Sequence, residues 1–78
     1  EFDDKFYAAL KLAVDQGKIS SSMLMRKLGL GFQRASRIID QMEECGYIGE
    51  SNGSKTRHVL MSRQDFDEMM MRRDENYD

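Results

Sequence analysis

The spacing of apolar residues changes at Gly46, and this change restricts the possible folds more than any other feature of the sequence. Before Gly46, apolar residues recur three and four positions apart, which is the spacing of one face of an α-helix. After it come two short β-prone runs, "YIGE" and "TRHVLM", separated by "SNGSK". Because Asn-Gly favours a tight turn, these runs predict a β-hairpin. The chain is therefore expected to form helices first and a hairpin afterwards.

Two helices are predicted in the first part of the chain. The first covers residues 4–16, with an aspartate before it as its N-cap and a glycine after its last turn. The second is the run "MLMRKL", with Ser21 or Ser22 as its N-cap. Between them, residues 18–20 are short and extended, and they can form a bridge to a later strand. The predicted core residues of this part are Phe6, Ala9, Leu10, Ala13, Val14, Leu24, Leu28 and Leu30.

A third helix is predicted to begin at Gly31 or Phe32 and to end before Gly46. A four-residue turn containing glycine joins it to the second helix, and this is the helix-turn-helix arrangement. Its predicted core stripe consists of Ala35, Ile38, Ile39 and Met42. Three helices followed by a hairpin, or wing, predict a winged helix-turn-helix of the α+β class, mainly α.

The chain of 78 residues is expected to form a single domain with a small core, which buries roughly 60–65% of the surface of the unfolded chain. Residues 4–61 form the predicted helices and wing. Ser62, followed three residues later by Asp65, resembles a capping box and predicts a last helix over residues 62–72. The remaining residues, 73–78, are expected to fray.

Charge is unevenly distributed along the chain, although the formal net charge is only −2. Residues 18–63 carry eight Lys or Arg against four Asp or Glu, a net charge of +4. The ends are acidic: residues 1–17 carry a net charge of −2, and residues 64–78 a net charge of −4. Because salt screens charges beyond ~8–10 Å, the basic centre matters more for contact with phosphates than the whole-chain charge.

A polar stripe runs along the third helix, opposite its core stripe. At 100° per residue, Arg37 lies about 40° and Asp40 about 20° from Gln33, whereas the core residues lie between about 140° and 240°. The outward face of such a helix enters the major groove of DNA, where these residue types pair with guanine, cytosine and adenine edges. The alternative is an ordinary solvated surface in which the three side chains pair with one another.

Other candidate DNA contacts lie on the wing and beside the third helix. Lys55 and Arg57 are placed where a wing touches the DNA backbone or the minor groove. For Arg34, Arg26 and Lys27, a phosphate contact competes with a simple solvated position, and the last two also suit the C-terminus of the second helix. Phe32 is expected in the core, with a stacking platform as the alternative.

Cysteine and histidine content argues against an enzyme or a metal site. The single Cys45 excludes an internal disulfide, fits a reducing, cytoplasmic compartment, and is expected to be half-buried. With His58 as the only histidine, a four-ligand zinc site is excluded, and no set of catalytic residues is recognisable. No cofactor is expected. No apolar run approaches the ~18 residues of a membrane span, and the acidic start does not resemble a signal peptide.

Two separated motifs resemble one family. "GFQRASRIIDQMEECGYI" is similar to the recognition helix of the γ domain of FtsK/SpoIIIE-type DNA translocases, which commonly shows Gly-Tyr-Asn-Arg-Ala-Ala-Arg-Ile-Ile-Glu-x-Met-Glu-x-x-Gly-Ile-Val. "GSKTRHVL" is similar to the wing of that family, Gly-Ser-Lys-Pro-Arg-Glu-Val-Leu. The distance between the motifs also agrees, and the resemblance extends from about Phe6 to Met70.

The resemblance implies a regulatory DNA-binding module of a hexameric, ATP-driven DNA pump in chromosome segregation, cell division or sporulation. Such modules recognise short, polar, G-rich sequences in double-stranded DNA, bind side by side and orient the pump; in some members they also activate a tyrosine recombinase. The implied partners are DNA, the motor domain of the parent protein and, in those members, the recombinase. This chain contains no phosphate loop of the type G-x-x-x-x-G-K-[ST], so it is not itself the motor. The parent protein is expected to be anchored at the septum, without membrane contact by this domain.

By the same resemblance, the base-reading positions are Gln33, Arg37 and Asp40. Arg37 matches the family pattern, Gln33 replaces the usual Asn and Asp40 the usual Glu, so two side chains differ in reach by one methylene. The resemblance also implies backbone contacts by Arg34 and Arg57, and Ser36, in place of an Ala, adds a possible phosphate contact. Two other functions remain open: a dimeric winged-helix transcriptional regulator, and a protein-interaction module that docks on a recombinase or motor subunit.

Overall fold

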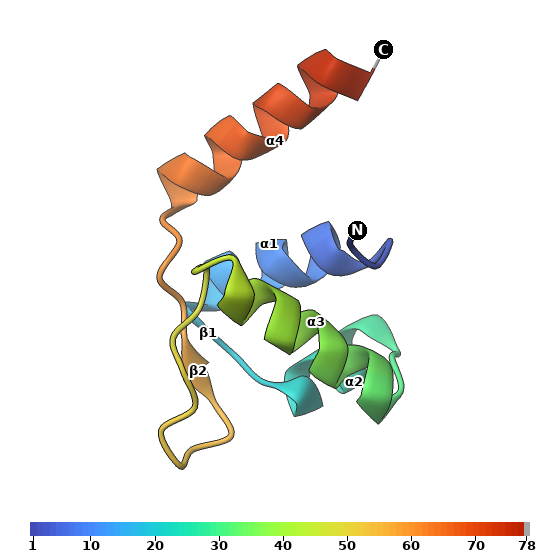
Figure 1. The fold of residues 1–78 in the computed structure, drawn as a ribbon, viewed down its shortest axis with the longest axis vertical. Coiled ribbons are helices and arrows are strands. Elements are labelled where there is room, and N and C mark those ends of the chain that lie inside the picture. Colours follow the sequence, from blue (N-terminus) through green and yellow to red (C-terminus); the bar gives the residue numbers. More distant parts are fainter. Residues whose placement is uncertain (78) are drawn as a thin grey trace.

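A computed structural model describes the backbone of residues 1–77 and the side chains of residues 1–74. The elements in chain order are α1 (Phe6–Gln16), β1 (Lys18–Ile19), α2 (Ser21–Leu28), α3 (Phe32–Glu44), β2 (Arg57–His58) and α4 (Arg63–Tyr77). In Figure 1, α3 lies in front of α2, α1 lies above them, the β1–β2 sheet lies at one end, and α4 lies above α1. The predicted winged helix-turn-helix, α+β and mainly α, is confirmed.

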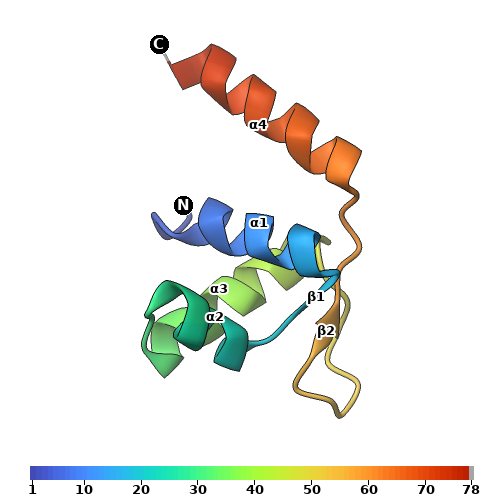
Figure 2. The same cartoon turned by 180° about the vertical axis from the view of Figure 1, so that it is seen from behind.

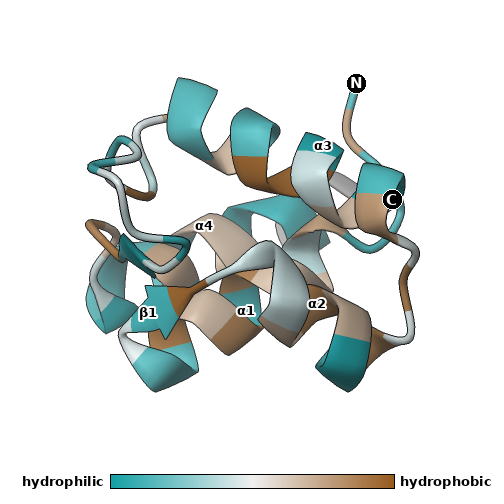
Figure 3. Cartoon of the chain, turned by 90° about the horizontal axis from the view of Figure 1, so that it is seen from below, coloured by the Kyte–Doolittle hydropathy of each residue, from teal (hydrophilic) through white to brown (hydrophobic). Residues whose placement is uncertain are grey.

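The core lies between α1, α2 and α3, where their apolar faces meet. In Figure 3 the apolar side of α3 is turned toward α1 and α2, and its hydrophilic side away from them. Most predicted core residues are buried, whereas Val14 and Leu28 are only partly covered. The buried residues are Phe6, Ala9, Leu10, Ala13, Ile19, Leu24, Leu30, Ala35, Ile38, Ile39, Met42, Ile48 and Phe66.

The N-cap of α2 is Ser20, and the predicted caps, Ser21 and Ser22, lie in its first turn. The Ser20 hydroxyl accepts a hydrogen bond from the Met23 amide (3.2 Å), and this bond satisfies one of the unpaired donors of the first turn. Ser20 takes this position because its backbone is extended (φ −150°), directly after β1. The hydroxyls of the two following serines are therefore free of the capping role.

The predicted hairpin is only partly formed in the wing, which we define as residues 48–59. β2 pairs with β1 in an antiparallel sheet, so the extended segment at 18–20 has the strand partner that was predicted for it. On the other side of β2, the first predicted hairpin strand forms only a single bridge, from Ile48 to Val59. The Gly49 carbonyl accepts from the Arg57 guanidinium (3.0 Å) rather than from a further ladder amide. The wing loop beyond this point is therefore not held by a strand pair.

The last helix, α4, begins after the predicted cap. The Ser62 hydroxyl accepts a hydrogen bond from the Asp65 amide (3.0 Å), which confirms the predicted start. Phe66 is buried, and the Tyr47 hydroxyl donates to the Met69 sulfur (3.6 Å). These contacts attach the first turns of α4 to the rest of the domain.

α4 is longer than predicted. The prediction ends this helix at residue 72 and lets residues 73–78 fray, but the helix continues to Tyr77. The guanidinium of Arg73 lies over the Tyr7 ring, 3.7 Å from its centroid, and this cation–π contact joins the later part of α4 to α1. Asp78, the last residue of the predicted tail, lies outside the described residues.

Cys45 is exposed at the end of α3, not half-buried as predicted, because the helix ends there and the chain turns away at Gly46 (φ +78°).

Within residues 1–77, no helix has both the length and the apolar content that crossing a membrane requires.

Candidate nucleic-acid interface

Each of the four sides of α3 has a different environment. One side forms the core, one faces the N-terminal segment, one faces the wing, and one faces outward. This division follows from the 100° turn per residue, which places Arg34 and Gln41 on one flank and Phe32 and Glu43 on the opposite flank. On both flanks, side chains of α3 pair with other parts of the chain, Arg34 with Asp3 and Glu43 with Arg57, whereas the outward side faces away from the rest of the domain.

The outward side of α3 carries the three predicted base-reading residues. Gln33, Arg37 and Asp40 are all exposed. Within residues 1–74, none of these side chains makes a hydrogen bond or an ion pair. Arg37 and Asp40 therefore do not form the i,i+3 pair that the solvated-surface alternative expects. All three belong to the basic central part of the sequence, residues 18–63, and their polar groups have no partner among the side chains of residues 1–74.

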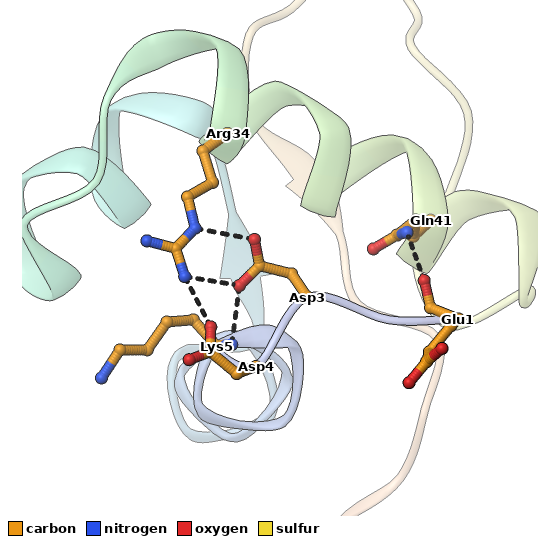
Figure 4. Close-up of polar contacts among 6 residues, drawn as sticks. All are labelled: Glu1, Asp3, Asp4, Lys5, Arg34 and Gln41. Carbon is orange, nitrogen blue, oxygen red and sulfur yellow. Dashed lines mark hydrogen bonds and ion pairs between the residues drawn. The ribbon is translucent and has the colours of Figure 1, made fainter.

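On the N-terminal flank, Arg34 is held by two aspartates (Figure 4). Its Nε donates to Asp3 Oδ2 (2.7 Å) and its Nη2 to Asp3 Oδ1 (2.8 Å), a bidentate pair. Nη2 also contacts Asp4 Oδ1 (2.6 Å). The Arg34 guanidinium, with a smaller contribution from the Lys5 amide, holds the pKa of the Asp3 carboxyl well below its usual range. Arg34, predicted to contact the DNA backbone, thus joins α3 to the start of α1 in this structure.

We expect the Arg34–Asp3 pair to contribute to stability in a pH-dependent way. Because the pKa of Asp3 is lowered in the folded state, the contribution is present above the unfolded pKa of about 4 and is lost as the pH falls through the folded value. Arg34→Gln should therefore lower the melting temperature at pH 7, and the difference from the unmodified protein should shrink as the pH drops below about 4. Circular dichroism melts across pH measure this difference.

The matched control for this prediction is Arg37→Gln, which removes the same group from the same helix at a position without an ion pair. This control should leave the melting temperature unchanged at pH 7. An equal loss in both variants would show that the Asp3 pair is not the cause.

On the wing flank, Arg57 is also used within the domain. Its Nη1 donates to Glu43 Oε1 (2.7 Å) and to the Gly49 carbonyl (3.0 Å). Its side chain is only 14% exposed. Arg57, predicted as a wing contact to DNA, therefore ties the wing to the end of α3. Lys55, two residues earlier, is exposed on the wing loop.

A groove of about 460 Å³ lies between the start of α2, the flank of α3 and the wing. Phe32 lines it and is 63% exposed, so the prediction that this residue lies in the core is wrong. The reason is that Leu30, just before α3, already fills the core at this end, while Phe32 starts the helix on its wing-facing flank. Ser36, one turn further along the same flank, is half-buried.

A second hollow, of about 480 Å³, is lined by four cations from three parts of the chain. Figure 2 shows α2 and β1 from this side, with the wing next to them. The cations are Lys18, Arg26, Lys27 and Lys55, and the described side chains, those of residues 1–74, place no carboxylate in the hollow. Three of them were predicted as phosphate contacts. Lys18 was missed because only the β1–β2 pairing places it beside the wing; its position in a segment predicted to pair with a later strand was the one available signal.

Within the described residues, no group of three or more His, Cys, Asp or Glu side chains is placed to hold a metal ion. The candidate site is instead a surface: the outward face of α3, the groove beside it and the basic hollow near the wing. A helix-turn-helix with an exposed polar third helix and a β wing defines a winged helix-turn-helix domain.

Comparisons with known proteins identify the family. The family described as the Ftsk gamma domain matches residues 1–62. DNA translocase FtsK of Clostridium tetani is 49% identical over 63 residues, which are 81% of this chain and 8% of that protein. DNA translocases SftA and SpoIIIE of Bacillus subtilis are 45% and 43% identical over 83% and 86% of this chain, respectively, and the chain covers 7% and 8% of their lengths. The chain belongs to the FtsK γ domain family, and α4 begins directly after the matched residues.

Proposed function

We propose that this domain binds double-stranded DNA in a sequence-specific manner, with the outward face of α3 in the major groove. The observation that carries the proposal is the exposed set of Gln33, Arg37 and Asp40, which pair with no side chain of residues 1–74 and lie opposite the core of α3. Membership of a family whose members are named DNA translocases supports it.

The three side chains have distinct base preferences. Arg37 pairs bidentately with O6 and N7 of guanine, Gln33 with N6 and N7 of adenine, and Asp40 accepts from N4 of cytosine. A guanine contact at the centre agrees with a preference for G-rich sites. Because Gln33 is one methylene longer and Asp40 one methylene shorter than the usual family residues, we expect a site preference shifted from that of the common pattern.

Phosphate contacts surround this face. Lys55 on the wing, together with Arg26, Lys27 and Lys18 around the basic hollow, forms a carboxylate-free rim that suits the DNA backbone. Ser36 adds a hydroxyl on the wing-facing flank. Arg34 and Arg57 form ion pairs with carboxylates of this chain. They are therefore expected to position α3 and the wing, and not to contact phosphates.

The parent protein is proposed to be a translocase. The chain covers only 7–8% of each compared relative, and we propose that the motor activity, the use of ATP and the location at the septum belong to other parts of the parent protein. The domain is proposed to act as the element that orients or loads the motor on DNA, with a tyrosine recombinase as a further partner. It is itself not an enzyme in this proposal.

In-vitro selection of bound sequences from a random DNA pool tests the proposal. Enrichment of a short, polar, guanine-containing motif is expected. Binding without any enriched motif would contradict base reading, and no binding at low salt would favour the protein-interaction alternative. A stable dimer of the free domain in sedimentation would favour the transcriptional-regulator alternative.

Lys55→Ala should weaken binding to all DNA sequences and flatten its salt dependence. Each phosphate neutralised by a cation releases counterions, so losing one such contact lowers the slope of log K against log[salt] by about 1. Titrations of preferred and random duplexes at several salt concentrations measure the slope. The matched control is Lys11→Ala, on α1 and away from both hollows. If the salt slope of Lys55→Ala is as steep as that of Lys11→Ala, the phosphate role of Lys55 is refuted.

A further inference from the structure

Phe32 is an exposed aromatic side chain at the edge of the candidate interface. It is 63% exposed, although the transfer of a phenyl ring out of water lowers the free energy. It occupies the first position of α3, next to Gln33 on the outward face. Its flank turns toward the wing, and the groove of about 460 Å³ opens beside it. An apolar ring is therefore kept in water directly beside a surface proposed to bind DNA.

The other groups in this groove suit an anionic, partly apolar occupant. Ser21 and Ser22 lie in the first turn of α2, where their hydroxyls are not used as the N-cap. Lys55 supplies a cation from the wing. Among the side chains of residues 1–74, no carboxylate lines the groove, so none of them repels a phosphate within it. Hydroxyl and ammonium donors thus flank the phenyl ring.

We propose that this groove receives one sugar–phosphate strand of the DNA and that Phe32 packs against a deoxyribose of that strand. The inference rests on the proposed DNA binding, to which it adds an apolar backbone contact. A strand alternates charged phosphates with sugars whose C–H groups are apolar, and this alternation matches donors on either side of a phenyl ring. Because the groove lies between the flank of α3 and the wing, we place in it a strand that borders the major groove entered by α3.

An apolar sugar contact has a distinctive thermodynamic signature. It buries apolar area and so adds affinity, but it neutralises no phosphate and releases no counterion. It also carries no base information, because every nucleotide has the same sugar. Phe32 should therefore add the same factor to the affinity on every sequence and at every salt concentration.

The test compares the DNA affinity of Phe32→Ala with that of the unmodified domain. We expect a loss of about 3- to 10-fold on both preferred and random duplexes, with an unchanged salt slope. Phe32→Leu should recover most of the affinity, because it restores apolar surface without the ring. Met71→Ala is the matched control: Met71 on α4 is also 63% exposed, and its truncation should leave affinity unchanged.

Four results would overturn the inference. One is an affinity of Phe32→Ala equal to that of Met71→Ala, and another is a flattened salt slope. The third is a loss confined to duplexes that contain thymine and abolished when uracil replaces it, which would assign the ring to a base methyl. The fourth is a fall in melting temperature of Phe32→Ala that accounts for its weaker binding, which would make Phe32 a structural residue.

The proposed function and this inference fail in different ways. If Phe32→Ala is neutral while Arg37→Ala still loses the preferred site, only the sugar contact is wrong. If the unmodified domain binds no DNA at low salt, both are wrong.

Discussion

Arg37→Ala is expected to lower the affinity for the preferred DNA site by about 1–3 kcal/mol, or roughly 5- to 150-fold, and to have little effect on random DNA. Arg37 is exposed on the outward face of α3, and it makes no ion pair with any side chain of residues 1–74. Its guanidinium is therefore available for a bidentate contact with guanine. Binding titrations with the selected site and with a scrambled duplex measure the difference.

Two further variants separate base reading from charge. Arg37→Lys keeps the cation but loses the planar pair of donors. It should therefore retain binding to random DNA and lose most of the difference in affinity between the preferred site and random DNA. Arg72→Ala removes an exposed arginine from α4 and should change neither affinity. Equal losses of Arg37→Ala on preferred and random DNA would show that Arg37 acts as a phosphate contact.

Phe6→Ala is expected to destabilise the domain by about 3–5 kcal/mol. Phe6 is fully buried in the core on α1 and lies 5.2 Å from the Tyr7 ring, centroid to centroid. Removing its ring leaves a cavity that a small core cannot close. Because a domain of this size has a free energy of unfolding near the low end of the usual 5–15 kcal/mol, much of the variant should be unfolded at 37 °C. Urea unfolding followed by circular dichroism measures the loss.

The matched control is Phe2→Ala. The Phe2 ring stacks on Phe6 with centroids 3.9 Å apart and planes 8° from parallel, but it is 40% exposed. Its removal should cost about 1 kcal/mol or less, because it leaves a surface depression and not a cavity. A similar cost for both variants would mean that burial does not set the contribution of Phe6.

The helices were predictable because their signals are local. The apolar residues of α1 and α3 recur at the helical spacing, and the stripes they predicted are the buried faces in the structure. Ser62 was recognised as a cap for the same reason, since capping involves residues three apart. The cap of α2 was predicted at Ser21 or Ser22, one or two residues too late, because three serines in a row offer the same local signal and only the end of β1 selects Ser20.

The wing was harder to predict because its partners are distant in sequence. Local propensity favoured pairing across the Asn-Gly turn. In the structure β2 pairs with β1, about 40 residues earlier, as the extended segment at 18–20 had suggested, and only one bridge forms in the predicted hairpin. This pairing also brings Lys18 to the basic hollow, so a residue that was not predicted as a DNA contact joins the candidate interface.

Sequence alone determined which residues of α3 face outward, since that depends only on a repeat of 3.6 residues per turn. It therefore placed Gln33, Arg37 and Asp40 on one exposed face. Tertiary structure decided which of the neighbouring groups are free: Arg34 pairs with Asp3, 31 residues away, and Arg57 with Glu43, while Phe32 is left in water beside the groove. The physical reason is that the direction in which a side chain points is set by its own helix. Whether a charged or apolar side chain finds a partner depends instead on which distant groups the fold brings within contact distance.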